Sequence, residues 1–162
     1  MVMWRIEFTS AKFCPYLPEE CQGNPGAYGF ELAHWLSVEL MKRKVVTTYP
    51  VGEDWGWLIE FLDGDLELTI GCSSEAEEGD GYSGKPIRWG IFIRPAGSLF
   101  KKPKGPAVDA AIRVLAEHIL AVLKEAGIQA EQQRWGASHP WIPPICRGTE
   151  SIIRHYGPDW RT

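Results

Sequence analysis

Cysteine and histidine are the residue types through which this chain could hold a metal ion. The cysteines stand at positions 14, 21, 72 and 146, with His139 and His155 on either side of the last one. Structural zinc sites favour ligand pairs separated by about two to four residues, because one turn must present both ligands to one ion. Cys14 and Cys21 are separated by six residues, and no pair has the zinc spacing. We therefore predict no metal site and no cofactor.

Cys72 is the residue best placed to act as a nucleophile, because it follows Gly71 at the end of an alternating stretch. A cysteine nucleophile needs a neighbouring base and a lowered pKa. The alternation places Cys72 on the apolar side, and free cysteine is among the most buried residue types. The pattern therefore favours a core thiol, and we predict no catalytic residue.

Acidic residues gather in the segment after Cys72, at Glu75, Glu77, Glu78 and Asp80. The segment lacks the alternating Asp or Asn ligands and the closing glutamate of an EF-hand calcium loop. We therefore expect a solvated loop that can attract a basic partner.

Tryptophan provides the other pronounced signal, at Trp55 and Trp57 in Gly52-Glu53-Asp54-Trp55-Gly56-Trp57. Alternation puts both rings on one strand face with Ile59, so we expect them to anchor the core. Two alternatives remain open. The rings could form an exposed interaction hot spot, or they could line a pocket between the central hairpin and the helices, together with Trp35 and Cys72.

The elements that must position these residues follow from periodicity. Alternating apolar residues predict strands over 2–9, 45–49, 55–61, 66–72 and 87–94, and 128–135 could add an edge strand. Residues 24–43 read as a helix that opens at Asn24-Pro25, and a second helix runs from Pro106 to a cap at Gly127.

Consecutive strands without crossover helices imply antiparallel pairing, and two amphipathic helices can cover only one face of the sheet. The predicted fold class is α+β: a two-layer sandwich with a mostly antiparallel sheet of about five strands and two helices on one face. We expect a single domain over 1–135 and a Pro/Trp-rich tail over 136–162.

The register of the central hairpin has two solutions. A turn on Asp63-Gly64 has the preferred tight-turn chemistry but sets Glu60 opposite Glu67. A turn on Gly64-Asp65 avoids that repulsion and pairs Phe61 with Leu68. Both registers keep the apolar faces together, so the sequence does not decide between them.

The bulk composition excludes some function classes. The chain has 162 residues and a net charge of −4, which argues against a general nucleic-acid binder. No stretch approaches the ~20 apolar residues of a membrane span, and the first residues do not resemble a signal peptide. We therefore expect a cytoplasmic protein with reduced thiols.

Glu53-Asp54-Trp55-Gly56-Trp57, with the Gly71-Cys72 strand end and the acidic loop after it, resembles a group of small uncharacterised bacterial proteins. These proteins share a strand, a helix, an Asp-Trp-Gly-Trp hairpin and a C-terminal helix. The resemblance covers about residues 1–127 and implies no activity for any residue. The tail and the segment between Cys14 and Cys21 look like additions to that core.

The leading functional hypothesis is a non-enzymatic protein that binds another protein, as an inhibitor or immunity-type antagonist in bacterial conflict. The partner surface would combine an open sheet face, the acidic loop and the aromatic tail; its candidate residues are Arg5, Arg88, Arg94, Glu75, Glu77, Glu78, Asp80, Trp141 and Trp160. The alternative is a small enzyme or ligand-binding domain that uses the aromatic pocket. A homodimer through an edge strand or the tail is a third reading.

Overall fold

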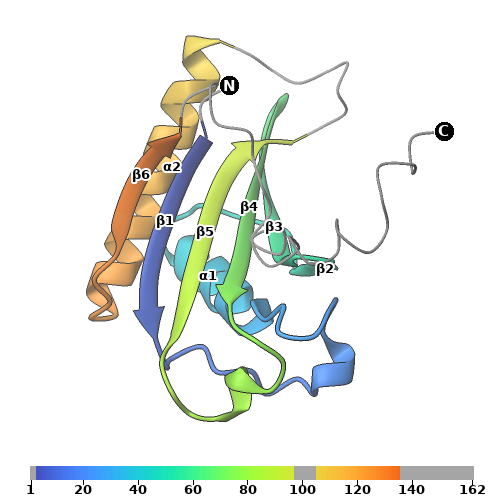
Figure 1. Cartoon of the computed structure of the whole chain (residues 1–162). Helices are drawn as coiled ribbons and strands as arrows, with labels where there is room; N and C mark the ends of the chain where they lie inside the picture. Colours follow the sequence, from blue (N-terminus) through green and yellow to red (C-terminus); the bar gives the residue numbers. More distant parts are fainter. Residues whose placement is uncertain (1–2, 97–104, 136–162) are drawn as a thin grey trace, which may run out of the picture.

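A single antiparallel sheet with both helices packed on one of its faces forms the fold, in a computed structural model that describes residues 3–96 and 105–135 (Figure 1). The strands are β1 (Met3–Ser10), β2 (Val51–Glu53), β3 (Gly56–Asp63), β4 (Leu66–Glu75), β5 (Ile87–Pro95) and β6 (Glu131–Trp135). The helices are α1 (Phe30–Lys42) and α2 (Pro106–Glu125), with 3₁₀ turns η1 (Glu19–Cys21) and η2 (Asp80–Tyr82).

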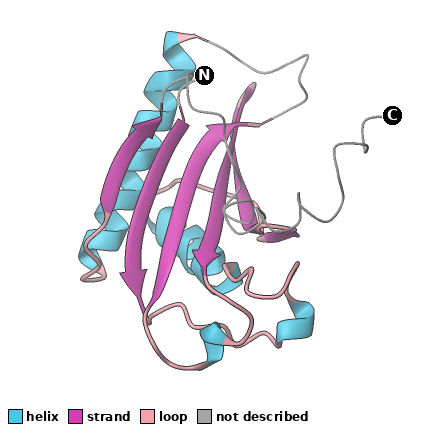
Figure 2. Cartoon of the chain, viewed as in Figure 1, coloured by secondary structure: helices cyan, strands magenta, loops and turns pink. Residues whose placement is uncertain are grey.

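The six described strands lie in the order β2-β3-β4-β5-β1-β6 (Figure 2). The predicted α+β class and the placement of the helices are confirmed, and β6 is the edge strand that the sequence allowed. The expected tail, including Trp141 and Trp160, lies outside the described residues.

The core lies between the sheet and the helices. Alternate residues of β1, β3, β4 and β5 point to the helices, and the fully buried ones include Ile6, Ile59, Ile70 and Ile91. The helices contribute their apolar sides; the hydrophobic residues there with no exposed surface are Leu32, Ala33, Leu36, Leu40, Ile112, Ala116, Ile119 and Leu123. Burial of each such leucine or isoleucine side chain stabilises the fold by roughly 1.5–3 kcal/mol.

Helix α2 begins and ends as predicted. Pro106 stands at its first position, and Gly127 follows its end with a φ of 76°, a conformation that glycine adopts without strain.

Helix α1 begins at Phe30, so the predicted start at Asn24-Pro25 is wrong. The Asn24 amide donates instead to the carbonyl of Asp54 at 2.7 Å. Gly29 precedes the helix with a φ of 153°, and a Cβ there would lie 2.6 Å from the Cys72 carbonyl oxygen. The close approach of the chain to β4 therefore delays the helix by several residues.

The predicted strand over 45–49 is also wrong. This segment makes one bridge to β3, between Thr47 and Phe61, and Thr48 exchanges hydrogen bonds of 2.9 Å with Glu60. Pro50 has no N–H to donate, and the edge strand β2 forms only after it.

The structure selects between the two hairpin registers. Asp63 pairs with Leu66, so the turn is Gly64-Asp65, and Phe61 pairs with Leu68. Glu60 then lies opposite Thr69 instead of Glu67, which keeps the two carboxylates apart. Gly64 adopts a φ of 59° in this turn.

Trp55 and Trp57 lie on opposite faces of the sheet, which corrects the expectation that they share one. Trp57 is in β3 and pairs with the buried Cys72, whereas Trp55 lies in the turn before β3 and packs on Phe92 at 5.0 Å between ring centroids. A turn over 54–55 and a strand beginning at Gly56 interrupt the alternation. A Cβ on Gly56 would meet the Cys72 carbonyl oxygen at 2.4 Å, so glycine is required there.

Candidate functional site

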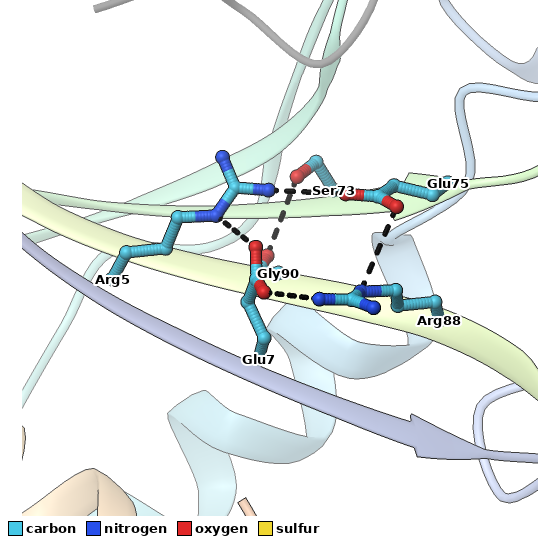
Figure 3. A network of polar contacts seen from close by, with 6 residues as sticks. All are labelled: Arg5, Glu7, Ser73, Glu75, Arg88 and Gly90. Atoms are coloured by element: carbon cyan, nitrogen blue, oxygen red, sulfur yellow. Dashed lines mark hydrogen bonds and ion pairs between the residues drawn. The ribbon is translucent and has the colours of Figure 1, made fainter. Parts of the chain in front are cut away.

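Two arginines and two glutamates form a closed network on the sheet face that the helices leave uncovered (Figure 3). Arg5 Nε lies 2.5 Å from Glu7 Oε1 and its Nη2 lies 3.2 Å from Glu75 Oε1. Arg88 Nη2 lies 2.5 Å from Glu7 Oε2, and its Nε lies 3.6 Å from Glu75 Oε2. Each carboxylate therefore meets both guanidinium groups.

The strand register brings these four residues together. Arg5 and Glu7 are alternate residues of β1, Arg88 belongs to β5, and Glu75 ends β4 directly opposite Arg88. Gly90 lies opposite Glu7 and carries no side chain; a Cβ there would come within 3.7 Å of Arg5 Nη2.

Burial sets the electrostatics of the network. Burial alone would raise the pKa of Glu7, but the hydrogen bond from Arg88 and the charge of Arg5 outweigh it and hold that pKa below its usual value. The same pairing with Glu7, and then the charge of Glu75, raise the pKa of Arg88. Glu7 and Arg88 are therefore charged at neutral pH.

The network changes the role of the predicted binding arginines. Arg5 was expected at the surface, but it is only 7% exposed and is paired with two glutamates. Arg88 keeps half of its side chain exposed, and Arg94 is half-buried with its guanidinium carbon 5.7 Å from the Phe92 ring centroid. Glu75 belongs to the network, whereas Glu77, Glu78 and Asp80 belong to the loop after β4.

A hollow of about 420 Å³ lies beside the network, where β6 stops covering β1; Glu7, Phe8, Thr9, Arg88, Gln129, Ala130 and Glu131 line it. A second hollow of about 480 Å³ lies at the end of α2, lined by Leu120, Lys124, Gly127, Ile128, Gln129 and Ala130. Sequence reasoning missed both, because the residues that they share, Gln129 and Ala130, have no chemical signature.

The acidic loop between β4 and β5 is fastened to the loop before α1. The Tyr28 hydroxyl donates to Glu19 Oε2 at 2.7 Å and accepts from the Gly79 N–H at 2.9 Å. Asp80 Oδ2 accepts from the Glu77 N–H at 2.9 Å, closing the loop on itself. Burial, and then the hydrogen bond with Glu19, raise the pKa of Tyr28 to about 12. The phenol therefore stays protonated and keeps donating.

A second tyrosine and a glycine complete this fastening. The Tyr82 hydroxyl donates to the Leu17 carbonyl at 2.5 Å. A Cβ on Gly81 would lie 2.6 Å from the Pro15 ring, so the two loops touch at that point. Glu77 and Glu78 remain exposed on the fastened loop.

The structure does not bring together the four residues of the predicted aromatic pocket. Trp57 packs on Phe30 with ring centroids 5.0 Å apart, and Trp35 packs on Phe13 at the same distance. Trp55 lies across the sheet from both. Cys72 has no exposed surface, and burial raises the pKa of its thiol, so it is a core thiol as predicted and not a nucleophile.

Aromatic residues that the sequence reading passed over gather at the start of α1. Phe30 lies at the centre of a group with Tyr16, His34 and Tyr49, and the buried Glu31 follows it in the helix. Tyr16 and Tyr49 are each 68% exposed. These residues come from three separate segments without a common spacing, so only the folded chain brings them together.

Within residues 3–96 and 105–135, no group of three or more His, Cys, Asp or Glu side chains is arranged to hold a metal ion. No helix in that part of the chain is both long and apolar enough to cross a bilayer.

No family model matches the chain, and neither a curated protein nor a solved structure does. The resemblance to the Asp-Trp-Gly-Trp hairpin proteins therefore stays a prediction. The functional argument has to rest on the geometry of this chain.

Proposed function

We propose that this chain is a non-enzymatic protein-binding protein, of the inhibitor or immunity type that neutralises a partner protein in bacterial conflict. Its partner would be basic, and the acidic loop over 76–86 would make the first contact. We further propose that it acts in the cytoplasm, because Cys14, Cys21 and Cys72 are all free thiols.

The fixed shape of the acidic loop is the observation that carries this proposal. Tyr28, Asp80 and Tyr82 hold the loop through side-chain hydrogen bonds while Glu77 and Glu78 stay exposed. A surface that is already ordered loses less conformational entropy when it binds. Exposed charges of one sign also accelerate encounter with a partner of the opposite sign.

The Arg–Glu network supports the same proposal at the neighbouring sheet face. Its positive and negative side chains pair with one another and come from three neighbouring strands. The network is therefore a rigid support for the residues around it. Arg88 and Glu75 reach the surface from this support, at the strand end from which the acidic loop starts. A partner that spans the loop and this strand end would meet both surfaces.

The test is capture of partners from a lysate of the native cell on immobilised chain. We compare the unchanged chain, the Glu77→Gln/Glu78→Gln double variant and the Glu117→Gln variant, whose substitution lies on the exposed side of α2. We expect a basic protein to be retained by the unchanged chain and by the α2 control. It should be lost from the double variant and released as salt screens the charges.

Two outcomes would contradict the proposal. One is that all three chains retain the same proteins at every salt concentration. The other is that the captured protein, once purified, keeps its full activity in the presence of a molar excess of this chain.

A further inference from the structure

The start of α1 carries a surface of aromatic rings centred on Phe30. Around it, the Tyr16 ring lies edge-on with centroids 6.0 Å apart, His34 stacks at 5.9 Å, and Tyr49 lies at 6.1 Å. Trp57 closes the inner side at 5.0 Å. Phe30 is buried, whereas Tyr16 and Tyr49 are each 68% exposed, so two tyrosines stand at the surface over an apolar base.

A buried carboxylate lies next to this surface, on the residue that follows Phe30. Glu31 is 7% exposed, and its Oε1 accepts from the backbone N–H groups of Tyr16 at 2.9 Å and Leu17 at 3.3 Å. Its Oε2 is buried without a hydrogen-bond partner in the described part of the chain, the only side-chain oxygen or nitrogen there of which this is true. A buried acceptor without a donor is costly, and an incoming donor would remove that cost.

The surroundings favour a positive charge. Glu19 and Glu20 lie in η1, and with Glu31 they raise the pKa of Tyr82, although burial of that phenol is the larger cause. Burial, and then the charge of Glu31, likewise raise the pKa of Tyr16. Among the described residues, the cations that lie over aromatic rings are Lys12 on Trp35 and Arg94 on Phe92, so no cation from this part of the chain lies over Tyr16 or Tyr49.

We infer that this surface takes an arginine side chain of the partner protein, which would stack between Tyr16 and Tyr49 and donate to Glu31 Oε2. The inference rests on the proposed function and names the partner chemistry that this end of the molecule fits. A guanidinium is planar, stacks on aromatic faces and is weakly hydrated, and it carries several N–H donors in fixed directions. These properties match two exposed rings next to a buried acceptor.

An arginine can reach the buried Glu31 Oε2 only after a neighbouring side chain moves, and in this inference that side chain is the exposed Tyr16 ring. Exposed side chains change rotamer within nanoseconds. The Tyr16 backbone can stay in place, since its N–H remains bonded to Glu31 Oε1 while the ring turns to lie along the guanidinium. The second carboxylate oxygen then becomes the acceptor for the guanidinium.

The test is an NMR titration of the isolated chain with N-acetyl-arginine amide, alongside N-acetyl-citrulline amide, which has nearly the same shape without the charge. We expect saturable shifts of the Tyr16 and Leu17 amide signals with the arginine probe and none with citrulline. Glu31→Gln should weaken arginine binding by about tenfold or more, which corresponds to the loss of one charge-assisted hydrogen bond.

Tyr49→Ala provides a second variant that does not disturb the buried carboxylate. The side chain is 68% exposed, so the fold should be kept while one wall of the site is removed. We expect binding to weaken about twofold to fivefold, the range of an exposed cation–π contact. Glu117→Gln on α2 should leave the titration unchanged and serves as the charge-matched control for Glu31→Gln.

Several outcomes would overturn the inference. These are equal binding of arginine and citrulline probes, shifts confined to other surfaces, and unchanged affinity in Tyr49→Ala. Tighter binding of tetramethylammonium than of the arginine probe would instead identify a methylated cation as the ligand. Because the titration uses no partner, the two proposals can fail separately. Arginine binding without loop-dependent capture of a partner would support this site and contradict the proposed function. Loop-dependent capture without arginine binding would support the proposed function and contradict this site.

Discussion

Glu7 is the residue on which the Arg–Glu network depends most, because it contacts both arginines and is the more buried of the two carboxylates. Its pKa is lowered in the folded chain, so it contributes stability above the pKa of an unfolded glutamate, about 4.3. That contribution is lost as the pH falls through the lower, folded value. Neutralising this side chain would leave the buried Arg5 guanidinium without its nearest carboxylate.

We therefore predict that Glu7→Gln lowers the free energy of unfolding at pH 7 by roughly 3–5 kcal/mol, the range for breaking a buried ion pair. The difference between the variant and the unchanged chain should shrink as the pH falls below 4, because Glu7 itself becomes protonated there. Urea unfolding at several pH values measures both quantities. A difference that stays constant from pH 7 to pH 3 would contradict the account of the network.

The sequence predicted the positions of some of these residues correctly, but it did not predict the burial or the contacts of others. The sequence placed Arg5 and Arg88 on the open sheet face, and the structure agrees. It could not show that Arg5 is buried, since exposure depends on what surrounds the strand and not on the pattern within it. The sequence did not indicate a role for Glu31 for a similar reason. The backbone N–H groups that donate to its carboxylate lie in a loop, 14 and 15 residues earlier in the chain.

At the scale of elements, close contact between β4 and β5 explains why position 71 holds a glycine. From the sequence alone, this residue was expected only to mark the end of a strand. A Cβ on Gly71 would lie 2.1 Å from the Phe92 ring, so the ring packs directly over the glycine and against Trp55. These contacts join the turn before β3 to β5.

We predict that Gly71→Ala lowers the free energy of unfolding by about 1–3 kcal/mol, because the added methyl displaces Phe92. The indole N–H signal of Trp55 should shift at the same time. Gly52→Ala is the matched control: its Cβ would make only ordinary contact with Trp57, at 3.5 Å. Equal stability of the two variants would show that Phe92 does not pack on Gly71 as described.

Element boundaries were predictable where one periodicity ran without interruption. Helix α2 is an example, because its stripe continues from Pro106 to the Gly127 cap. Boundaries failed where tertiary contacts replaced local preference. Asn24 donates to the Asp54 carbonyl instead of capping a helix, and Pro50 separates β2 from a segment that makes only one bridge. The expectation that Trp55 and Trp57 share one face of the sheet was wrong because a turn interrupts the alternation.

At the scale of the whole molecule, the two long loops and the start of α1 form one acidic and aromatic end. Glu77 and Glu78 lie on the loop after β4, and Tyr16 and Glu31 lie where the other loop meets α1. Hydrogen bonds of Tyr28 and Tyr82 join the two loops, so this end would meet a partner as one surface. Its composition contrasts with α2, whose outer side carries mixed charges.

The measurement that tests the central claim most directly is hydrogen–deuterium exchange of the chain alone and with its captured partner. We predict that binding slows exchange in residues 12–28 and 76–86, with the amides of Tyr16 and Leu17 among the most affected, while α2 exchanges as in the free chain. Slowed exchange confined to α2, or no change in either loop at saturating partner, would contradict the account.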